Sequence, residues 1–459
     1  MKRVAIIGGG ISGLTALHFL RQKHAEAFAV TLYEKDDRLG GTIGTDRDSG
    51  FISDWGPNGF LDKVPLTLRV VRELGLDNLL EPAAPGAEKR FIYRNNILNE
   101  ISASPLKFLR SSLLSIPGRM RLLSEPFISQ KKDERDESVF DFAVRRIGRE
   151  AAENMIVPMV SGIFGGDARQ LSLKACFPVM VEMEKNYGSL FKALIAKKRA
   201  GKKASAAGPS GRLTSFANGL YTLIEFMQNK YKDHIQTGTE VVGVDKNDTG
   251  YNLYFRQGRP EKYDAVICAA PAYAAVQIFS IMDGELGRLL STFPYASISV
   301  VCSGYRREVI RHNLAGFGFL VPRNQGKRML GSIWTSSIFK GRSPEGMVQF
   351  RSMVGGATDP EAIALSETEL VKLVHDELKS IVGIENKPAY TRIFKYERGI
   401  PQFVLGHPDK MSRLERLLKS HPDLYFTGNA YEGVGLNDCV IRSDKVVNQL
   451  AKRAFTPAH

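Results

Sequence analysis

Three glycine-rich stretches and one carboxylate are the residues of this chain whose spacing predicts chemistry. The first stretch, GGGISGL at residues 8–14, directly follows the apolar run VAII, and Glu34 lies about twenty residues further on. In this arrangement Gly8 permits a tight turn, Gly10 lets the backbone approach a diphosphate, and Gly13 lets a helix pack close to the turn. Backbone N–H groups at a helix N-terminus favour bound phosphate. Because Glu34 would accept hydrogen bonds from a ribose, the pattern predicts a dinucleotide site.

The elements that must position this motif occur in the required order. An apolar strand at residues 4–7 is followed by leucines at 14, 17 and 20, spaced as on one face of a helix, and by a second apolar run at 28–33. A glycine-rich turn in an unrelated α/β protein is the alternative, and it would not need the strands, the helix and the acid in this register. We expect Ile11 and Ser12, at the start of the helix, to contact the cofactor together with the glycines.

A second turn distinguishes between dinucleotides. Residues 35–42 read KDDRLGGT, a pair of glycines preceded by an arginine. Such a turn is not needed to hold NAD, but it fits a longer cofactor whose second half crosses the sheet. It resembles the RxGG element of the FAD-dependent amine oxidase superfamily. We therefore predict FAD, with contacts from this turn at Lys35, Arg38, Gly40, Gly41 and Thr42.

The third stretch, TGNAYEGVGLNDC at residues 427–439, lies close to the end of the chain. If the chain leaves the nucleotide-binding domain and returns, this last loop can close the site that the first loop opens. Val434, Gly435 and Leu436 would then precede a final helix at 439–451, whose N-terminus would stabilise negative charge on the reduced cofactor. The alternative is a glycine-rich turn without a ligand.

Composition limits the remaining possibilities. A chain of 459 residues with 43% hydrophobic content can bury a large core and should form two or three lobes. The four cysteines form no CxxC pair, which argues against a zinc site, a redox dithiol or a disulfide framework, so no metal site is expected. No signal-like hydrophobic region precedes the first strand, and Pro271 and Gln277 interrupt the longest apolar stretch. We expect a cytoplasmic protein without a transmembrane helix.

Basic residues dominate the charge balance. The net charge is +14, and residues 192–212 contain seven Lys or Arg and no acid. The main interpretation of this segment is a solvated loop. The alternatives are contact with anionic lipid, which would make the protein peripheral to a membrane, and attraction of an acidic substrate. Nucleic acid is not an expected partner, because the segment lacks interleaved aromatic residues.

The order of elements predicts an α/β fold with a discontinuous nucleotide-binding domain. Residues 239–244 and 264–271 are predicted to add two strands to its sheet, and a second sheet should contain strands at 297–302, 316–321, 329–334 and 347–354. The predicted parts are a Rossmann-like FAD-binding domain (1–65, 215–275 and 395–459), a helical lobe of the membrane-facing type (82–205) and an interleaved β-rich substrate-binding domain (276–394).

The source of electrons follows from what the sequence lacks. A NADPH-dependent reductase would carry a second GxGxxG after a strand, and the segment around Phe317 has only two of the glycines. The cysteines supply no redox pair. We therefore expect an oxidase, in which an organic substrate reduces FAD directly and molecular oxygen or another acceptor takes the electrons. No histidine or carboxylate cluster indicates which substrate that is.

Nearly the whole chain resembles the oxygen-dependent, FAD-containing family of protoporphyrinogen oxidases and coproporphyrinogen III oxidases. The motifs SGIFGGD and GNAYxGVGLNDC are specific to this group and are absent from general amine oxidases. The matching stretches include GGGISGL (8–14), DWGPNGFL (54–61), DESV (136–139), SGIFGGD (161–167), YGSL (187–190), GIPQ (399–402) and GNAYEGVGLNDC (428–439).

This resemblance implies further cofactor contacts. Val241 would hold the adenine side through its backbone, and Tyr396 stands where the family usually has a tryptophan near the flavin. The flavin itself would be lined by Gly56, Pro57, Asn58 and Gly59. His407 would support the loop after Gln402 and transfer no protons.

The resemblance also implies the reaction, a step of heme biosynthesis. A porphyrinogen would be oxidised to a porphyrin in three two-electron steps at flavin N5, with oxygen reduced to hydrogen peroxide and no catalytic side chain. The pocket should be apolar and broad, with a basic rim, between the helical lobe and the second sheet. Candidate substrate contacts are Arg69, Phe164, Tyr295 and Phe317.

Protoporphyrinogen IX is the predicted substrate and coproporphyrinogen III the alternative. Outside residues 192–212 the sequence shows no tight cluster of cations for four propionates, and GVGLNDC is closer to protoporphyrinogen oxidases of Gram-negative bacteria. More distant alternatives are a flavin oxidase or desaturase acting on amines or carotenoids, and a non-enzymatic binding protein on the same scaffold. A homodimer is compatible with the sequence.

Overall fold

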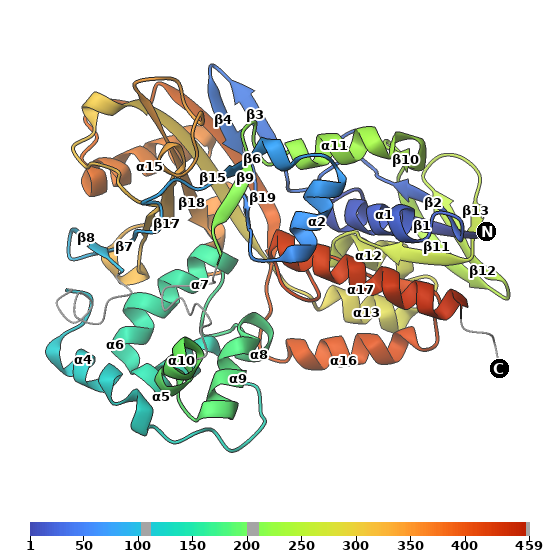
Figure 1. The fold of residues 1–459 in the computed structure, drawn as a ribbon, viewed down its shortest axis with the longest axis horizontal. Helices are drawn as coiled ribbons and strands as arrows, with labels where there is room; N and C mark the ends of the chain where they lie inside the picture. The colour runs from blue at the N-terminus through green and yellow to red at the C-terminus, as the bar shows by residue number, and fades with distance from the viewer. Residues whose placement is uncertain (102–111, 200–210, 456–459) are drawn as a thin grey trace.

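The protein has three parts, which Figure 1 shows as a nucleotide-type α/β domain, a second sheet and a helical lobe. The computed structural model describes residues 1–101, 112–199 and 211–455. The chain passes repeatedly between these parts, so each is built from segments that lie far apart in the sequence.

The first sheet is parallel and has the strand order β10-β2-β1-β14-β20. Its central strands are apolar because both faces are covered, as parallel sheets require. On one face Val4 and Ile6 of β1 pack with α1 (Ile11–Lys23), α11 (Thr222–Lys230) and α17 (Leu436–Phe455); on the other, Ala5 and Ile7 pack with α12 (Ala272–Phe279) and α13 (Gly284–Ser291). The strands are β1 (Lys2–Ile7), β2 (Phe28–Tyr33), β10 (Ile235–Gln236), β14 (Ala265–Cys268) and β20 (Leu424–Phe426).

One of the two strands predicted to extend this sheet is in it, and the other is not. The prediction at residues 264–271 is confirmed by β14, which pairs with β1. The prediction at 239–244 was wrong: β11 (Val241–Asn247) pairs antiparallel with β12 (Gly250–Phe255), which pairs with β13 (Glu261–Tyr263). The turn between β11 and β12 folds the chain back at once, because Asn247 accepts the Thr249 N–H at 2.9 Å. An apolar run alone does not specify which sheet a strand joins.

The second sheet has seven strands in the order β19-β15-β18-β17-β16-β7-β8. All four of its predicted strands are confirmed. Helix α15 (Glu367–Val382), which begins with a capping box of Ser366 and Glu369, covers one face. The other face packs Val300 and Cys302 against Phe51. The strands are β7 (Arg90–Arg94), β8 (Ile97–Glu100), β15 (Tyr295–Arg306), β16 (Gly318–Leu320), β17 (Met329–Trp334), β18 (Met347–Gly355) and β19 (Tyr390–Pro401).

This sheet crosses two of the predicted domain limits. Strands β7 and β8 lie within the range 82–205 that the sequence assigned to the helical lobe, and β19 runs to residue 401, beyond the predicted limit at 394. The division of the chain into domains stays a prediction; the strand pairing shows which segments share this sheet. Shorter elements connect the parts: β3 (Thr45–Asp48), β4 (Phe51–Asp54), β5 (Phe60–Leu61), β6 (Leu80–Pro82), β9 (Leu213–Phe216), α2 (Pro65–Glu73), α14 (Thr335–Ile338) and α16 (His407–Leu418).

The helical lobe has its own apolar core, made by α5, α7, α8 and their neighbours. Residues 192–199, predicted to begin a solvated loop, instead continue helix α10, in which Ala193 is fully buried. Ser189 starts this helix by accepting the Lys192 N–H at 3.2 Å. Residues 200–210 lie outside the described residues. The helices are α4 (Ile116–Leu123), α5 (Val139–Ile147), α6 (Arg149–Ala151), α7 (Val157–Phe164), α8 (Leu173–Cys176), α9 (Pro178–Tyr187) and α10 (Leu190–Arg199).

A buried ion cluster joins the helices of this lobe. Arg146 of α5 forms an ion pair with Glu125, and both side chains are fully buried. Glu125 also accepts the Ser189 hydroxyl and the Leu190 N–H, and Arg146 reaches Glu184 of α9 at 3.4 Å. Burial acts to raise the pKa of Glu125, but the hydrogen bonds and Arg146 outweigh it, so that this pKa lies below its ordinary value of 4.5.

Replacing Glu125 with Gln should therefore destabilise the lobe. The substitution removes the closer of the two carboxylates and leaves the buried Arg146 with only the longer contact to Glu184, and breaking a buried pair typically costs about 3–5 kcal/mol. Because the pKa of Glu125 is lowered in the folded protein, its contribution is fully present above pH 4.5 and is lost as the pH falls through the lowered value. Urea unfolding followed by circular dichroism would measure both effects.

The matched control is Glu308→Gln, whose partner Arg306 is equally exposed at 72%. This exposed pair should contribute at most about 1 kcal/mol. Equal stability losses in the two variants would contradict the assignment of the buried pair.

Candidate cofactor site

The turn after β1 is built for close approach of a ligand. Gly8 has a φ of +108°, and a Cβ on Gly13 would lie 1.9 Å from the Gly8 carbonyl oxygen, so α1 packs directly on the turn only because residue 13 is glycine. In contrast, a Cβ on Gly10 would meet nothing within 4 Å. The first turn of α1 therefore faces open space, which suits a diphosphate at the helix N-terminus.

The second glycine turn lies against the first. The Gly40 N–H donates to the Gly9 carbonyl at 2.9 Å, and a Cβ on Gly41 would have only the Gly10 Cα nearby, at 3.6 Å. Arg38 shapes this turn by donating to the carbonyls of Leu39, Gly41 and Ile43, while its guanidinium lies 4.4 Å from the centre of the Trp55 ring. Arg38 thus fixes the conformation of the turn through hydrogen bonds to its carbonyl oxygens.

Glu34 lies at the end of β2, beside the phosphate turn. Its carboxylate accepts the Gly9 N–H at 2.7 Å and the Asp36 N–H at 3.0 Å, and each oxygen keeps a lone pair for a ribose hydroxyl. The Thr239 N–H donates to the Glu34 carbonyl at 2.8 Å, which brings the start of β11 and Val241 to the same edge. Lys35 is exposed and forms an ion pair with Asp36.

The third glycine stretch reaches the site from the end of the chain. The Thr427 N–H donates to the Cys268 carbonyl at 2.9 Å, which continues the β14–β20 pairing into the loop. Helix α17, predicted to start at 439, already starts at Leu436, and its Ser443 hydroxyl donates to the Ser12 carbonyl at 2.8 Å. Figure 1 shows α17 lying along α1. The last loop therefore meets the first at the carboxyl ends of the parallel strands, where ligands of such folds bind.

A carboxylate occupies the first turn of α17. Asp438 accepts the Gly435 N–H at 3.0 Å, and burial raises the pKa of Asp438 even though this hydrogen bond lowers it. The contact fixes the residues 433–436 that precede the helix.

Residues 56–59 approach from a fourth direction. A Cβ on Gly56 would lie 2.3 Å from the Thr42 carbonyl oxygen, so this loop rests on the second glycine turn. The Asn58 amide nitrogen and the Tyr396 hydroxyl are buried without a hydrogen-bond partner. Buried polar groups are normally paired. Open space at Gly10, together with these two orphaned polar atoms, fits a long polar cofactor that extends from α1 toward the second sheet.

The four predicted substrate residues lie in different surroundings. Phe164 ends α7, contacts Phe177 and lies where the helical lobe meets the second sheet. Arg69 forms ion pairs with Glu73 and with Asp444 of α17. The Tyr295 hydroxyl accepts the Ala272 N–H at 3.0 Å, and Phe317 lies 5.0 Å under the Arg90 guanidinium. They do not form one cluster, and their contact with substrate stays a prediction.

Two arginines that sequence reasoning missed connect the second sheet to the 54–56 segment. Arg342 forms an ion pair with Asp54 at 3.1 Å and donates to the Ser215 hydroxyl at 2.9 Å. Arg351 of β18 donates to the carbonyls of Asp54, Trp55 and Gly56. The one feature of the sequence that could have indicated Arg351 is its position inside the otherwise uncharged stretch 347–354.

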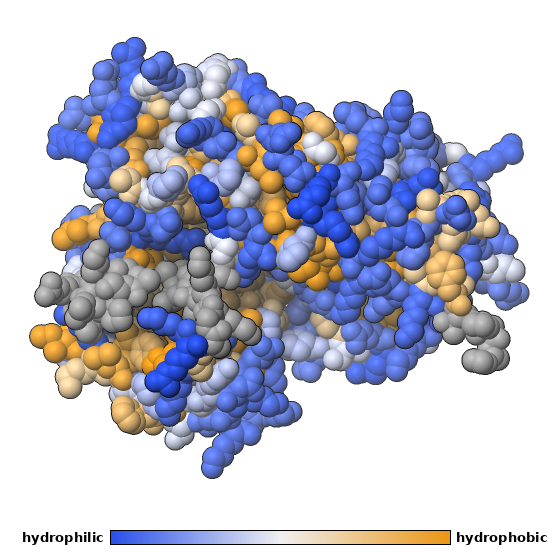
Figure 2. Space-filling view, in the orientation of Figure 1, coloured by the Kyte–Doolittle hydropathy of each residue, from blue (hydrophilic) through white to orange (hydrophobic). Residues whose placement is uncertain are grey.

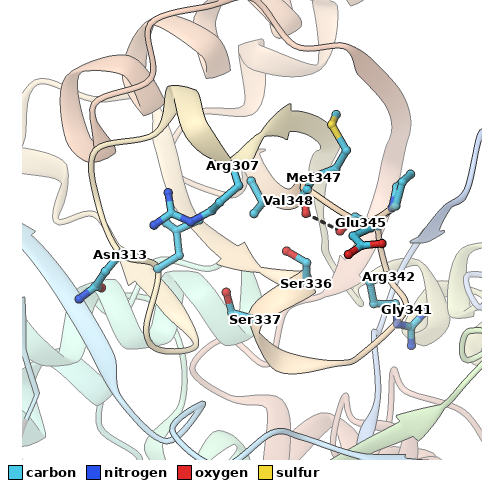
Figure 3. Close-up of a pocket in the computed structure, with 13 residues that line it drawn as sticks. Arg307, Asn313, Ser336, Ser337, Gly341, Arg342, Glu345, Met347 and Val348 are labelled. Atoms are coloured by element: carbon cyan, nitrogen blue, oxygen red, sulfur yellow. Dashed lines mark hydrogen bonds between the residues drawn. The ribbon is translucent and has the colours of Figure 1, made fainter.

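A polar cavity of about 380 Å³ lies beside Arg342, between α14 and the turn before β18. Figure 3 shows Arg342 at its edge, with the guanidinium directed away from the cavity and Ser336 and Ser337 facing it. The cavity is thus separate from the glycine turns. Among residues 1–101, 112–199 and 211–455, no group of three or more His, Cys, Asp or Glu side chains is arranged to hold a metal ion.

Comparisons with known proteins agree with this geometry. The family model of flavin-containing amine oxidoreductases matches residues 11–450. Coproporphyrinogen III oxidase of Bacillus subtilis (strain 168) is 30% identical over 99% of both chains, and protoporphyrinogen oxidase 1, chloroplastic, of Arabidopsis thaliana is 32% identical over 95% of this chain and 85% of its own. A crystal structure from Exiguobacterium sp. 255-15, provisionally named a protoporphyrinogen oxidase, superimposes with a TM-score of 0.84 at 25% identity, covering 98% of this chain and 99% of that chain.

The family match spans the first helix, the second glycine turn, the loop at 56–59 and most of the last helix. The cofactor of the protein is FAD. The protein is an oxidoreductase, and the chain belongs to the flavin-containing amine oxidoreductase family.

Proposed function

We propose that the protein oxidises protoporphyrinogen IX to protoporphyrin IX, with molecular oxygen as the electron acceptor. Six hydrogen atoms leave the macrocycle in three two-electron steps, and each pair converts one O2 to H2O2. FAD, when bound, supplies the two-electron acceptor for the substrate. The observation that carries the proposal is the full-length similarity to relatives named as porphyrinogen oxidases, at 30–32% identity.

The junction of the helical lobe with the second sheet supports a large apolar substrate. The Gly165 carbonyl accepts the Ala357 N–H at 2.7 Å, and a Cβ on Gly165 would lie 3.3 Å from Ile400 and 4.0 Å from Ile298. The motif SGIFGGD thus ends directly on the sheet, beside Phe164. Apolar walls of this kind would position a flat macrocycle and exclude water, which is the part of catalysis left to the protein when the cofactor carries the chemistry.

The alternative substrate is coproporphyrinogen III, and the Bacillus subtilis relative, which covers 99% of both chains, favours it. The two porphyrinogens share the reacting macrocycle and differ at its rim, where coproporphyrinogen III has four propionates and protoporphyrinogen IX has two propionates and two vinyl groups. The cofactor loops therefore do not distinguish them. Our choice rests on the shortage of clustered cations outside residues 192–212 and on the motif GVGLNDC, which resembles protoporphyrinogen oxidases of Gram-negative bacteria more closely.

Replacing Gly10 with Val should yield colourless protein, because the side chain would fill the open space in front of α1. Flavin absorbance per mole of purified protein is the measurement. The control is Gly284→Val at the start of α13, where the nearest atom to a Cβ is a flexible Arg288 nitrogen at 3.5 Å. Stoichiometric FAD in the Gly10→Val protein would refute the assignment of the phosphate turn.

Wild-type protein should oxidise protoporphyrinogen IX with the higher kcat/KM. Burying a carboxylate without a partner is costly, so two additional propionates should lower kcat/KM by roughly tenfold or more. Porphyrin fluorescence under air, recorded side by side for both substrates, measures the ratio. A preference for coproporphyrinogen III would reverse the choice of substrate, and fluorescence with neither would reject the porphyrinogen oxidase assignment.

We also propose that the protein is cytoplasmic and that the helical lobe rests on an anionic membrane surface. Figure 2 shows apolar side chains gathered over α4. Ile116, Met120, Leu123 and Phe127 are all more than half exposed, Phe127 to 87%. Helix α10 adds exposed Ile195 and ends in three cations, Lys197, Lys198 and Arg199. In the described part of the chain, no helix is long and apolar enough to span a bilayer.

An apolar surface beside cations is the pattern that binds at the interface of anionic bilayers. Changing Lys197, Lys198 and Arg199 to Gln should weaken co-sedimentation with phosphatidylserine-containing vesicles by about 1 kcal/mol per charge, or about fivefold each. Turnover in solution should not change. The control variant carries Arg259→Gln, Lys262→Gln and Lys419→Gln, three exposed cations of the nucleotide-type domain. Equal vesicle binding by both variants would remove the proposed contact.

A further inference from the structure

One buried arginine in the described part of the chain has no carboxylate as an ion-pair partner. In the described part of the chain four arginines are buried: Arg146, Arg342, Arg351 and Arg442. Arg146 pairs with Glu125, Arg342 with Asp54, and Arg442 with Glu432. Among the same described residues, Arg351 forms no ion pair, although only 6% of its surface is exposed. A guanidinium is always protonated, so Arg351 is a buried positive charge without a counter-ion from the protein.

The carboxylate of Asp54, whose backbone carbonyl Arg351 contacts, is already engaged. Arg351 donates to the backbone carbonyl of Asp54 at 3.3 Å, and the Asp54 side chain is directed elsewhere. One of its oxygens accepts the Thr45 hydroxyl at 2.6 Å and the Leu220 N–H at 2.9 Å, and the other pairs with Arg342. Asp54 therefore neutralises Arg342, and the hydrogen-bond acceptors of Arg351 are backbone carbonyl oxygens.

Carbonyl oxygens compensate a buried charge only in part. Taking an ion out of water is expensive unless a charge of opposite sign replaces the lost hydration. The three paired arginines satisfy this rule within the protein. For Arg351 the missing negative charge is expected on a ligand that lies next to the 54–56 segment.

The position of Arg351 indicates which ligand this is. In the β15–β18 pairing Arg351 lies opposite Cys302, whose side of the sheet packs against Phe51 in β4. Its third acceptor is the Gly56 carbonyl, and Gly56 rests on Thr42 in the second glycine turn. The buried Tyr396 hydroxyl, which has no hydrogen-bond partner, is also close enough for Arg351 to lower the pKa of that phenol, which burial raises to about 12. Arg351 thus lies directly behind the loop predicted to line the flavin.

We propose that Arg351 is a positioning residue that holds the 54–56 carbonyls and places its uncompensated charge where it stabilises the negative charge that FAD gains on reduction. The consequence is a higher reduction potential of the bound flavin and easier electron transfer from the substrate. This inference rests on the prediction, made from the family resemblance, that residues 56–59 line the flavin ring; it does not depend on which porphyrinogen is the substrate.

Two substitutions separate charge from geometry. Arg351→Gln removes the charge, whereas Arg351→Lys keeps the charge and loses the planar fork that reaches three carbonyls. The control is Arg392→Gln on β19. Arg392 also lies opposite Cys302, but it is 44% exposed and already neutralised by Asp46 and Asp48.

The measurement is the midpoint potential of the bound FAD, determined anaerobically against a reference dye. Sulfite affinity is a second readout, because sulfite binds more tightly to flavins with a stabilised negative charge. At a fixed potential, Arg351→Gln should lower the ratio of reduced to oxidised flavin at least tenfold, which is about 30 mV for a two-electron couple. Its sulfite affinity should fall by a similar factor. The midpoint potential and the sulfite affinity of the Arg351→Lys variant should lie between those of Arg351→Gln and the wild type. Both quantities in Arg392→Gln should match the wild type.

Each of the remaining outcomes either supports or overturns the proposal. An unchanged potential in Arg351→Gln, or equal decreases in the Gln and Lys variants, would overturn the role of the charge. If the Gln variant does not retain FAD while the Lys variant does, a cation is required and the proposal stands; loss of FAD from both variants would leave a packing role only and overturn it. Porphyrin formation by the wild type is recorded in parallel. Its absence would reject the proposed substrate, while the potentials would still decide the role of Arg351.

Discussion

The contact between Gly13 and the Gly8 carbonyl is the constraint on which the cofactor site depends. At this point α1 touches the end of β1 with no side chain between them, since a Cβ on Gly13 would lie 1.9 Å from the oxygen. The same solution is used where Gly56 meets Thr42. At both contacts backbone packs directly on backbone, and the start of α1 borders the open space at Gly10. A larger residue at either contact would force the segments apart.

Four segments of the chain must converge to complete this site. The phosphate turn, the second glycine turn and the 56–59 loop come from the first sixty residues, and the loop before α17 comes from the last thirty-five or so. The second sheet and the helical lobe are built from the chain between them. The hydrogen bond from the Ser443 hydroxyl to the Ser12 carbonyl fixes the last helix, α17, against the first helix, α1, and so brings the two ends of the chain together at the site. The glycine-rich loop stands at the end of the sequence because its strand, β20, is the last to join the first sheet.

Local patterns predicted the parts of this arrangement that depend on neighbouring residues. The strand, turn and helix at 1–23 and the strands of the second sheet follow from apolar periodicity and glycine spacing. The strand that pairs with β11 could not be predicted in this way, because tertiary packing decides whether β11 joins an existing sheet or forms a tight hairpin at Asn247. The helical state of residues 192–199 was missed for a related reason, since Ala193 is buried against the lobe.

The site was predictable to the same extent. The glycine turns and Glu34 were placed correctly relative to one another, whereas Arg351 was not identified, because its carbonyl partners lie nearly 300 residues earlier in the sequence. The predicted substrate residues depend on how the lobe meets the second sheet. No spacing in a single sequence contains that information.

With the flavin placed beside Arg351 as proposed, the cofactor becomes part of the electrostatic balance of the fold. Arg146 links helices of the lobe, Arg442 anchors α17, and Arg342 ties the second sheet to Asp54, each with a carboxylate from the chain. Only at Arg351, among the buried arginines of the described chain, is the opposite charge missing, and this arginine lies where the second sheet meets the nucleotide-type domain. A ligand that binds only the folded state adds its binding free energy to stability. FAD bound beside Arg351 would therefore strengthen the junction between the two sheets, so that redox tuning and domain assembly depend on the same side chain.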